Sequence, residues 1–282
     1  FSWESKLVLS YQQNKVLKLP DNGIAKNRTG GIALGDGTFF GGIAEGEPLN
    51  RFYGYVATGI IETEEQAANA NYDALSRLPQ KGAKRVGDYE WADRNGDGQI
   101  TTADQFCLGV TVPPFTGGLQ NSFRLKNWTL SLYLDWATGH SIFDESYSRY
   151  FYGTFTNNYA LAKDVLKAWK KPGDKTKYAK FYANDSNWGN DNYNRRATNT
   201  FTYKGDYLCL REITLQYSLP SKLFTKVGLK GVTLTVSGNN LYYFTEVKGI
   251  SPEAGSSTTY DGDVFYNYPP IRRFSFGVRL IF

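Results

Sequence analysis

The sequence predicts an all-β protein whose antiparallel strands form part of a transmembrane β-barrel. Three observations support this fold class. Apolar and polar residues alternate with period two along several segments, aromatic residues lie at the ends of those segments, and the connections between them are either short or very long.

Seven segments carry the alternation, and most have the length of about 9–11 residues that a tilted strand needs to cross a bilayer. In the clearest one, Trp128, Leu130, Leu132, Leu134 and Trp136 share one face, and polar residues and a tyrosine share the other. The weakest is 49–61, whose facing the pattern does not decide. In chain order the predicted strands are residues 3–11, 49–61, 115–125, 128–136, 212–219, 232–244 and 274–282.

The connections distinguish a membrane barrel from a soluble sandwich, which alternates in the same way. Residues 126–127 and 220–231 form short links, whereas 63–114, 139–205 and 245–271 are long. Counting strands back from Phe282 places both short links on one side and the three long ones on the other, as in outer-membrane barrels with long extracellular loops. The glycine-rich stretch 14–48 is an exception, because the same count assigns it to the short side.

Composition excludes several classes of protein. The chain has 282 residues, 16% aromatic and 21% charged, with a net charge of +5. No run of about 20 apolar residues exists, so a helical membrane bundle is excluded. The small positive excess is scattered, which gives nucleic-acid binding little support. One His and two Cys leave few ligands for zinc or for a cysteine nucleophile, and we expect no enzymatic activity.

Seven strands cannot close a barrel, so we expect further strands before Phe1. The alternative is a soluble, secreted β-sandwich that binds carbohydrate and holds a structural calcium. That alternative explains the alternation and the aromatic residues, but it explains neither the one-sided loops nor a terminal strand ending on Phe282. A third alternative is a porin without energy coupling.

The motifs resemble the carboxyl-terminal end of the SusC/RagA family of TonB-linked outer membrane transporters. The resemblance covers most of the chain from about Glu47, and its motifs stand in the order "GEPLNRFYGYVATGI", "GDYEWADRNGDGQITTAD", "LGVTVPPFTGGLQNSFRLKNWTLSLYLDWATG", "GDYLCLREITLQYSLPSKL", "LTVSGNNLYYFTEVKGISPEAG" and "YDGDVFYNYPPIRRFSFGVRLIF". The chain departs from the family pattern at Cys209, Val247 and Ser251, where the family usually has Arg, Tyr and Asp.

The resemblance implies a barrel of roughly 22 strands around an amino-terminal plug, of which residues 1–282 would be the carboxyl-terminal portion. It also implies location in the bacterial outer membrane and import of an oligosaccharide or an oligopeptide. The implied partners are a SusD-like surface lipoprotein and, through the part upstream, an inner-membrane TonB complex.

The strongest chemical motif is the loop of residues 93–104. Calcium loops place oxygen ligands at positions 1, 3, 5, 7, 9 and 12, with Gly at position 6 for the turn, which is Gly98 here. We expect one structural Ca²⁺ or Mg²⁺, although an Asx-rich turn without metal would have the same composition. The candidate ligands are Asp93, Asn95, Asp97, the Gln99 carbonyl, Thr101 through water, and Asp104.

Aromatic residues among Asn and Asp in 156–200 are candidates for stacking on a sugar or a peptide, although loop aromatics commonly pack on one another. The candidate ligand-binding residues are Tyr178, Tyr182, Trp188 and Tyr193. Just before them, Leu161, Val165, Leu166 and Trp169 have helical spacing, which predicts a helix within 159–170 that packs at the barrel mouth.

Three further features have simpler interpretations. Cys107 and Cys209 lie near the extracellular strand ends, where a disulfide is permitted, but two buried, unpaired thiols are favoured. His140 has no Cys or His partner in sequence and is not expected to be a base. Phe276, Leu280 and Phe282 share one face of the last strand and resemble the aromatic signal for barrel assembly.

Overall fold

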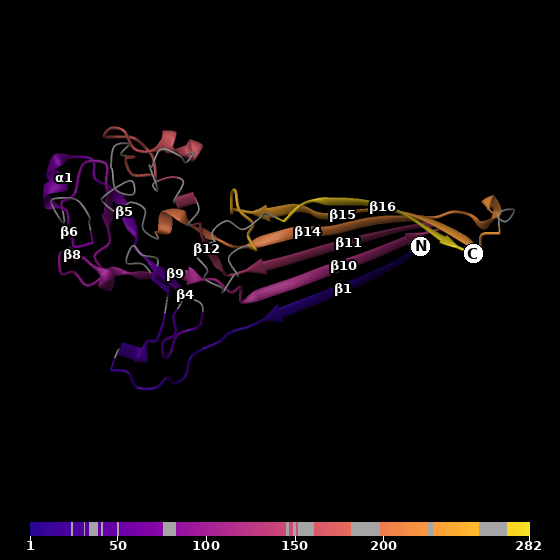
Figure 1. Ribbon diagram of the computed structural model, residues 1–282, viewed down its shortest axis with the longest axis horizontal. Helices are drawn as coiled ribbons and strands as arrows, with labels where there is room; N and C mark the ends of the chain where they lie inside the picture. The colour runs from indigo at the N-terminus through magenta and orange to yellow at the C-terminus, as the bar shows by residue number, and fades with distance from the viewer. Residues whose placement is uncertain are drawn as a thin grey trace.

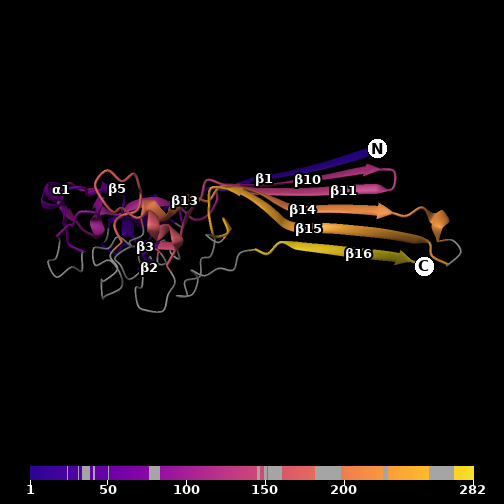
Figure 2. The same cartoon turned by 90° about the horizontal axis from the view of Figure 1, so that it is seen from above.

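The computed structural model is a long β-sheet with a compact assembly of loops at one end (Figure 1). It describes residues 1–23, 25–30, 32–33, 39–40, 42–49, 51–75, 83–144, 147–148, 151, 161–181, 198–224, 228–253 and 270–282. Both termini lie at the end of the sheet that is remote from the loop assembly (Figure 2).

Six strands form the main sheet, in the order β1-β10-β11-β14-β15-β16, and each pairs antiparallel with its neighbours. The antiparallel all-β architecture predicted by the alternation is therefore confirmed. The strands are β1 (Ser2–Tyr11), β10 (Phe115–Leu125), β11 (Trp128–Thr138), β14 (Tyr207–Ser218), β15 (Gly231–Thr245) and β16 (Arg273–Ile281).

The prediction that 49–61 is a crossing strand is wrong. This segment forms β4 (Arg51–Gly54) and β5 (Ala57–Ile60), which belong to two small sheets inside the loop assembly. Phe52 and Tyr55 are both fully buried there. In a strand that crosses a bilayer, side chains on one face would be exposed to lipid and those on the other to the barrel interior. Meanwhile β1 pairs directly with β10, from Ser2 opposite Arg124 to Tyr11 opposite Phe115.

This correction removes the exception in the loop pattern. Residues 12–114 form one excursion that leaves and rejoins the sheet at the same end, where the Gln12 amide donates to the Pro114 carbonyl at 2.9 Å. The glycine-rich stretch 14–48 therefore belongs to the long-loop side. The connections at one end of the main sheet are short, and those at the other end are long.

The two faces of the sheet differ as the alternation predicts. One face carries exposed Leu, Val and aromatic side chains, and aromatic residues lie toward both ends of the strands. Trp3 stacks on Phe123, and the ring pairs Tyr11–Phe115 and Trp128–Tyr217 are tilted; each pair joins two neighbouring strands. Such a face suits a lipid environment with interfacial aromatic girdles. The opposite face carries mostly Thr, Ser, Gln, Asn and charged residues.

The buried hydrophobic cluster of the described residues lies in the loop assembly. It contains Tyr55, Tyr89, Trp91, Ile100, Phe151, Ala168, Ala179 and Phe201. A buried ion pair lies beside it, with Lys84 Nζ 3.2 Å from Asp73 Oδ2. Many of the aromatic side chains that do not face lipid are therefore packed against one another in the loops.

Short elements make up the rest of the loop assembly. They are η1 (Ala25–Asn27), β2 (Ile32–Ala33), β3 (Phe39–Phe40), α1 (Glu64–Asn69), β6 (Tyr72–Asp73), β7 (Tyr89–Trp91), β8 (Gln99–Ile100), η2 (Thr102–Asp104), β9 (Phe106–Val110), β12 (Ser141–Phe143), η3 (Lys163–Lys167), η4 (Asn199–Phe201) and β13 (Thr202–Lys204). At the opposite end of the sheet, η5 (Ser221–Leu223) lies in the short link between β14 and β15. None of the helices in the described ranges is long and apolar enough to cross a membrane.

The predicted amphipathic helix within 159–170 is corrected to a short 3₁₀ turn, at least over the described residues 161–170. η3 spans Lys163–Lys167 only. Val165 packs against the loop core and Trp169 is buried, but Leu166 is exposed. The chain leaves helical geometry because the Trp169 amide donates to the Tyr178 carbonyl at 2.9 Å, which draws residues 169–178 into a tight loop.

Candidate functional site at the loop end of the sheet

The loop of residues 93–104 is built by its own carboxylates. Asp93 accepts hydrogen bonds from the backbone amides of Gly96 at 2.7 Å and Gly98 at 2.8 Å. These bonds, the one from Gly98 foremost, lower the pKa of Asp93. Gly96 and Gly98 have φ of 74° and 76°, a left-handed conformation in which a side chain would be strained. The glycines therefore let the backbone turn around Asp93.

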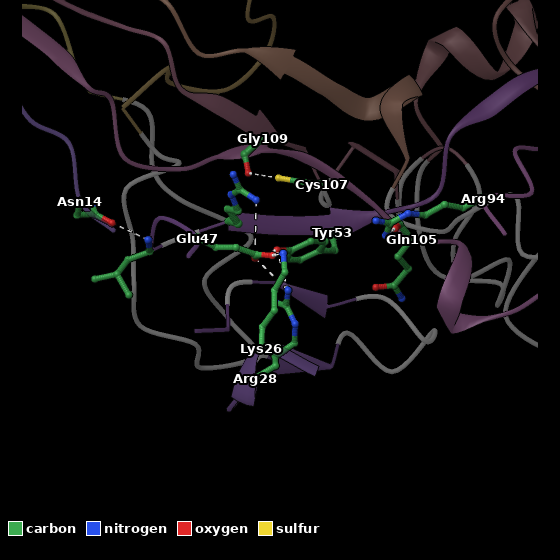
Figure 3. Close-up of polar contacts among 11 residues, drawn as sticks. Asn14, Lys26, Arg28, Glu47, Tyr53, Arg94, Gln105, Cys107 and Gly109 are labelled. Atoms are coloured by element: carbon green, nitrogen blue, oxygen red, sulfur yellow. Dashed lines mark hydrogen bonds and ion pairs between the residues drawn. The ribbon is translucent and has the colours of Figure 1, made fainter. Parts of the chain in front are cut away.

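Asp104 joins the beginning and the end of the same loop through its carboxylate. It is fully buried and accepts from the amides of Arg94 at 2.9 Å and Thr101 at 2.7 Å. Thr101 and Asp104 form a reciprocal capping box on η2. Ile100, also fully buried, anchors the loop to the core, and the Arg94 guanidinium donates to the Gln105 carbonyl at 2.9 Å (Figure 3).

The candidate metal ligands of this loop differ in burial and in how their oxygens are used. Asn95 and Asp97 are exposed and Asp93 is half-buried, and their oxygens are of the hard type that Ca²⁺ prefers. Asn95 Nδ2 donates to Asp97 Oδ2 at 2.9 Å. Asp93 and Asp104 each have both carboxylate oxygens engaged by backbone amides. Among the described residues, no group of three or more His, Cys, Asp or Glu side chains is arranged to hold a metal. The calcium site stays a prediction, and Asn95 and Asp97 are its exposed candidate ligands.

A second charged cluster, the Glu47 cluster, joins the start of the excursion to β4. Glu47 receives Lys26 Nζ at 2.7 Å, Arg28 Nη2 at 3.0 Å and the Tyr53 hydroxyl at 2.6 Å (Figure 3). Arg51 lies 3.7 Å away. Burial alone would raise the pKa of Glu47, but these hydrogen bonds outweigh it and lower the pKa to about 2. The cluster thus holds a nearly buried carboxylate in its charged form.

Of the predicted ligand-binding aromatics, only Tyr178 lies within the described residues; Tyr182, Trp188 and Tyr193 lie outside them. The ring of Tyr178 stacks on Phe151 with centroids 4.5 Å apart, and Lys177 Nζ lies 5.2 Å from the ring centroid. Burial raises the pKa of its hydroxyl. Tyr178 therefore belongs to the packed aromatic core, and its role toward a ligand stays a prediction.

Sequence reasoning missed a polar network centred on Arg211. It lies on the polar face of the main sheet, which is the inner face of the barrel wall. The guanidinium of Arg211 makes a bidentate pair with Asp135 at 2.7 and 2.6 Å and donates to Asn240 at 2.9 Å and to the Tyr243 hydroxyl at 3.1 Å. It also pairs with Glu253, from the loop that follows β15. The network therefore ties the loop after β15 to the polar face of the sheet across β11, β14 and β15.

A β-bulge makes this network possible. The register shifts between Leu210 and Glu212, so that Arg211 is left out of the ladder. Glu212 contacts the hydroxyl of Thr214 at 2.7 Å, two residues along on the same face. Arg211 and Glu212 thus both point inward, which a bulge permits and strict alternation forbids. In the sequence, the only sign of this bulge was the pair of adjacent charged residues, Arg211 and Glu212, within an alternating strand.

The cysteines and the histidine have structural surroundings. Cys107 and Cys209 are both unpaired; Cys209 is buried as expected, but Cys107 is exposed on β9, and its Sγ contacts the Gly109 carbonyl at 3.6 Å (Figure 3). His140 is buried, with Nε2 3.3 Å from the Pro252 carbonyl. Phe276, Leu280 and Phe282 are all exposed, on the last strand of the sheet and just after it.

Three curated proteins of Formosa agariphila match the chain along all or most of its length. TonB-dependent receptor P3 is 30% identical over the whole chain, P39 is 29% identical over 91% of it, and P26 is 25% identical over the whole chain. The chain spans about a quarter of the length of these relatives, 26–27% in each case. No family model matches it.

Solved structures agree in fold. The structure of the RagAB peptide transporter superposes with a TM-score of 0.66 at 19% identity, covering 99% of this chain and 27% of that one. The RagAB peptide importer in its open-open state gives 0.65 at 20% identity, with the same coverage. The main sheet and its loops therefore have the form of one sector of that larger chain.

Proposed function

Because the chain belongs to the SusC/RagA-like TonB-dependent transporters, as part of their outer-membrane barrel, we propose that the whole protein imports a large nutrient, an oligosaccharide or an oligopeptide. The observation that carries the proposal is the arrangement of the loops. The long connections leave one end of the sheet, and described residues of the two longest, between β1 and β10 and between β11 and β14, pack around a common aromatic core. Such an assembly forms one side of a mouth through which a solute could reach the inner face.

The Arg211 network supports the same proposal. It joins the loop at Glu253 to Asp135 on the inner wall, so that the loop and the wall have a fixed relation where a solute would enter. A SusD-like lipoprotein over the mouth, a plug within the barrel and energy supplied by a TonB complex complete the proposed transporter. The matched structures of the RagAB peptide transporter support a peptide as one of the two substrate classes.

The alternative, a soluble calcium-stabilised sandwich that binds carbohydrate, has less support. A sandwich needs a second sheet packed face to face on the first. In the described parts of the chain, the small sheets lie at the end of the main sheet and leave its apolar face exposed (Figure 1).

Uptake by intact cells tests the proposal. A strain that lacks the gene is complemented with the wild type, and the uptake of fluorescent oligosaccharides and oligopeptides is measured with and without a protonophore. We expect the wild type to restore uptake of one class and the protonophore to abolish it. Uptake that persists without the proton gradient would contradict a TonB-dependent mechanism.

An inner-wall variant sharpens the test. Arg211→Gln breaks the tie between Glu253 and Asp135, and we expect it to reduce uptake while the amount of assembled barrel is unchanged. Arg279→Gln is the matched control, since Arg279 lies on β16 at the remote end of the sheet. Equal uptake by the two variants would mean that the Arg211 contacts with Glu253 and Asp135 are not needed for transport.

A further inference from the structure

The positive excess of the chain is less scattered than its composition suggests, because much of it lies in one loop segment, residues 161–181. Seven lysines and two aspartates give this segment a net charge of +5, as large as that of the whole chain. The segment belongs to the long connection between β11 and β14, so it lies at the loop end of the sheet. The lysines are Lys163, Lys167, Lys170, Lys171, Lys175, Lys177 and Lys180.

Hydrogen bonds fold the middle of this segment into a compact turn. The Trp169 amide donates to the Tyr178 carbonyl at 2.9 Å, and the Thr176 hydroxyl donates to the Lys167 carbonyl at 2.7 Å. Two small residues of the turn belong to the loop core, Ala168 and Ala179. Because the turn is held against the core in this way, the lysines between these two alanines are exposed.

The carboxylates at this turn are engaged by backbone amides. Asp174 accepts from the amides of Lys170 at 2.9 Å and Lys171 at 3.0 Å, and these bonds, the one from Lys170 foremost, lower its pKa. Glu62, which precedes α1, accepts from the Gly173 amide at 3.1 Å. The two carboxylates therefore fix the shape of the turn, and neither forms an ion pair with a described lysine of the segment.

Most of the ammonium groups of the segment are available to a ligand. Asp164 pairs with Lys167 Nζ at 2.6 Å, and Lys177 Nζ donates to the Thr200 carbonyl at 3.1 Å. Four other exposed lysines have side chains that make no hydrogen bond or ion pair with any residue that the structure describes. They are Lys163, Lys170, Lys171 and Lys175.

A lysine from a different connection joins these four. Lys248 is exposed in the loop after β15, and its like charge lowers the pKa of Lys177 further than burial alone does. The same loop reaches the inner face of the sheet at Glu253, which pairs with Arg211. The basic patch, defined as Lys163, Lys170, Lys171, Lys175 and Lys248, therefore adjoins the loop that contacts the polar inner face.

We propose that the basic patch binds an oligosaccharide whose sugars carry sulfate or carboxylate groups. The inference rests on the proposed import function and narrows its substrate class to anionic oligosaccharides. Such a chain carries charges at repeated positions, so several ion pairs form with one ligand and strengthen one another through their linkage. Clusters of lysine are a known pattern for binding sulfated sugars.

The chemistry of the patch favours a sugar over an acidic peptide. Peptides are commonly held by an open strand edge, by an apolar groove or by arginine side chains that form paired hydrogen bonds. Residues 161–181 form no strand and contain no arginine. Lysine ammonium groups are point charges, so they can pair with anionic groups whose orientation differs from one sugar to the next.

Ligand binding to the full-length protein in detergent tests the proposal without any transport step. Calorimetry measures the affinity for a heparin octasaccharide, for an oligogalacturonate and for neutral maltoheptaose, with polyglutamate and single-stranded DNA as anions of other classes. We expect one or both anionic oligosaccharides to bind more tightly than the other three ligands. Which of the two binds identifies sulfate or carboxylate as the recognised group. Affinity should fall as salt rises from about 0.05 to 0.5 M.

A charge-matched pair of variants locates the site. The first combines Lys170→Gln, Lys171→Gln and Lys175→Gln, and we expect about tenfold weaker binding, since each exposed ion pair contributes about twofold. The control combines Lys126→Gln, Lys222→Gln and Lys230→Gln, which removes the same charge at the remote end of the sheet and should leave the affinity unchanged. Heat-modifiable migration in gels checks that both variants are assembled.

Several outcomes would overturn the proposal. They are no binding of either anionic oligosaccharide, tighter binding of polyglutamate or DNA, and an equal loss of affinity in the two variants. Binding and uptake of maltoheptaose in preference to the anionic sugars would also overturn it, but would leave the proposed import intact. Failure of the proposed import would instead appear as uptake that the protonophore does not abolish.

Discussion

At the scale of single residues, Glu47 decides how the amino-terminal part of the excursion is held. Its carboxylate is nearly buried and meets Lys26, Arg28 and Tyr53 at hydrogen-bond distance. A buried carboxylate without such partners would be costly, whereas a hydrogen bond to a charged group stabilises by about 1.5–3 kcal/mol. The guanidinium of Arg28 also lies 4.9 Å from the Tyr53 ring centroid, which adds a cation–π contact.

The lowered pKa gives this cluster a defined pH dependence. The pKa of Glu47 falls from 4.5 to about 2 on folding, so its contribution is present above pH 4.5 and is lost as the pH falls toward 2. We expect Glu47→Gln to reduce hydrogen-exchange protection of peptides within residues 14–54 about thirtyfold at pH 7, or about 2 kcal/mol.

The control for this prediction is Glu65→Gln, on the exposed surface of α1. Protection of the wild type, corrected for the intrinsic exchange rate, should decline between pH 4.5 and pH 2, and that of Glu47→Gln should decline less. Parallel declines in the two proteins would assign the acid sensitivity to other groups.

Residue patterns also set the limit of what alternation can predict. The facing of Trp128, Leu130, Leu132 and Leu134 followed from period two because each strand residue simply alternates between lipid and water. Arg211 and Glu212 break the pattern through a bulge, which depends on how three neighbouring strands pair. Partners such as Asp135 and Glu253 are distant in sequence, so no local signal could assemble them.

At the scale of elements, β16 presents an apolar outer face along its whole length. Phe274, Phe276, Val278 and Leu280 are exposed on it, as is Phe282 just beyond. Machinery that inserts strands into a membrane could recognise such a regular face. We expect Phe282→Ala to lower the amount of assembled barrel severalfold, measured by heat-modifiable migration in gels. Phe274→Ala, on the same strand, is the control, and an equal loss in both variants would indicate general hydrophobicity and not a signal.

The loop of residues 93–104 makes a second prediction at this scale. Its exposed oxygens should bind Ca²⁺ in the millimolar range of extracellular sites, and protection of peptides covering the loop should rise with Ca²⁺. Asp97→Asn keeps an oxygen that can accept from the Gln99 amide but removes the charge, so this dependence should disappear.

Asp174→Asn is a suitable comparison, because Asp174 also accepts from backbone amides but in a different turn. It should leave the Ca²⁺ response intact. A wild-type loop that shows no response to Ca²⁺ would mean that the turn is held by its hydrogen bonds alone.

At the scale of the whole molecule, the sheet was largely predictable and the loop assembly was not. A membrane strand needs only the right length and alternation, and both are local. In the loop assembly a side chain can be buried by neighbours on every side, as Phe52 and Tyr55 are. An alternating pattern cannot distinguish such a segment from a strand that crosses the membrane. The error at 49–61 and the shortened helix near Val165 have this same cause.

The direct pairing of β1 with β10 has a kinetic consequence. Gln12 and Pro113 are hydrogen-bonded although 101 positions separate them. Closing a flexible loop costs more entropy as its length grows, and contacts between distant residues slow folding. If the excursion packs its own core first, its two ends are brought together and most of that cost is already met. We therefore expect β1 to be the last of the six strands to pair, and the rate of that step to depend on how fast the loop assembly forms.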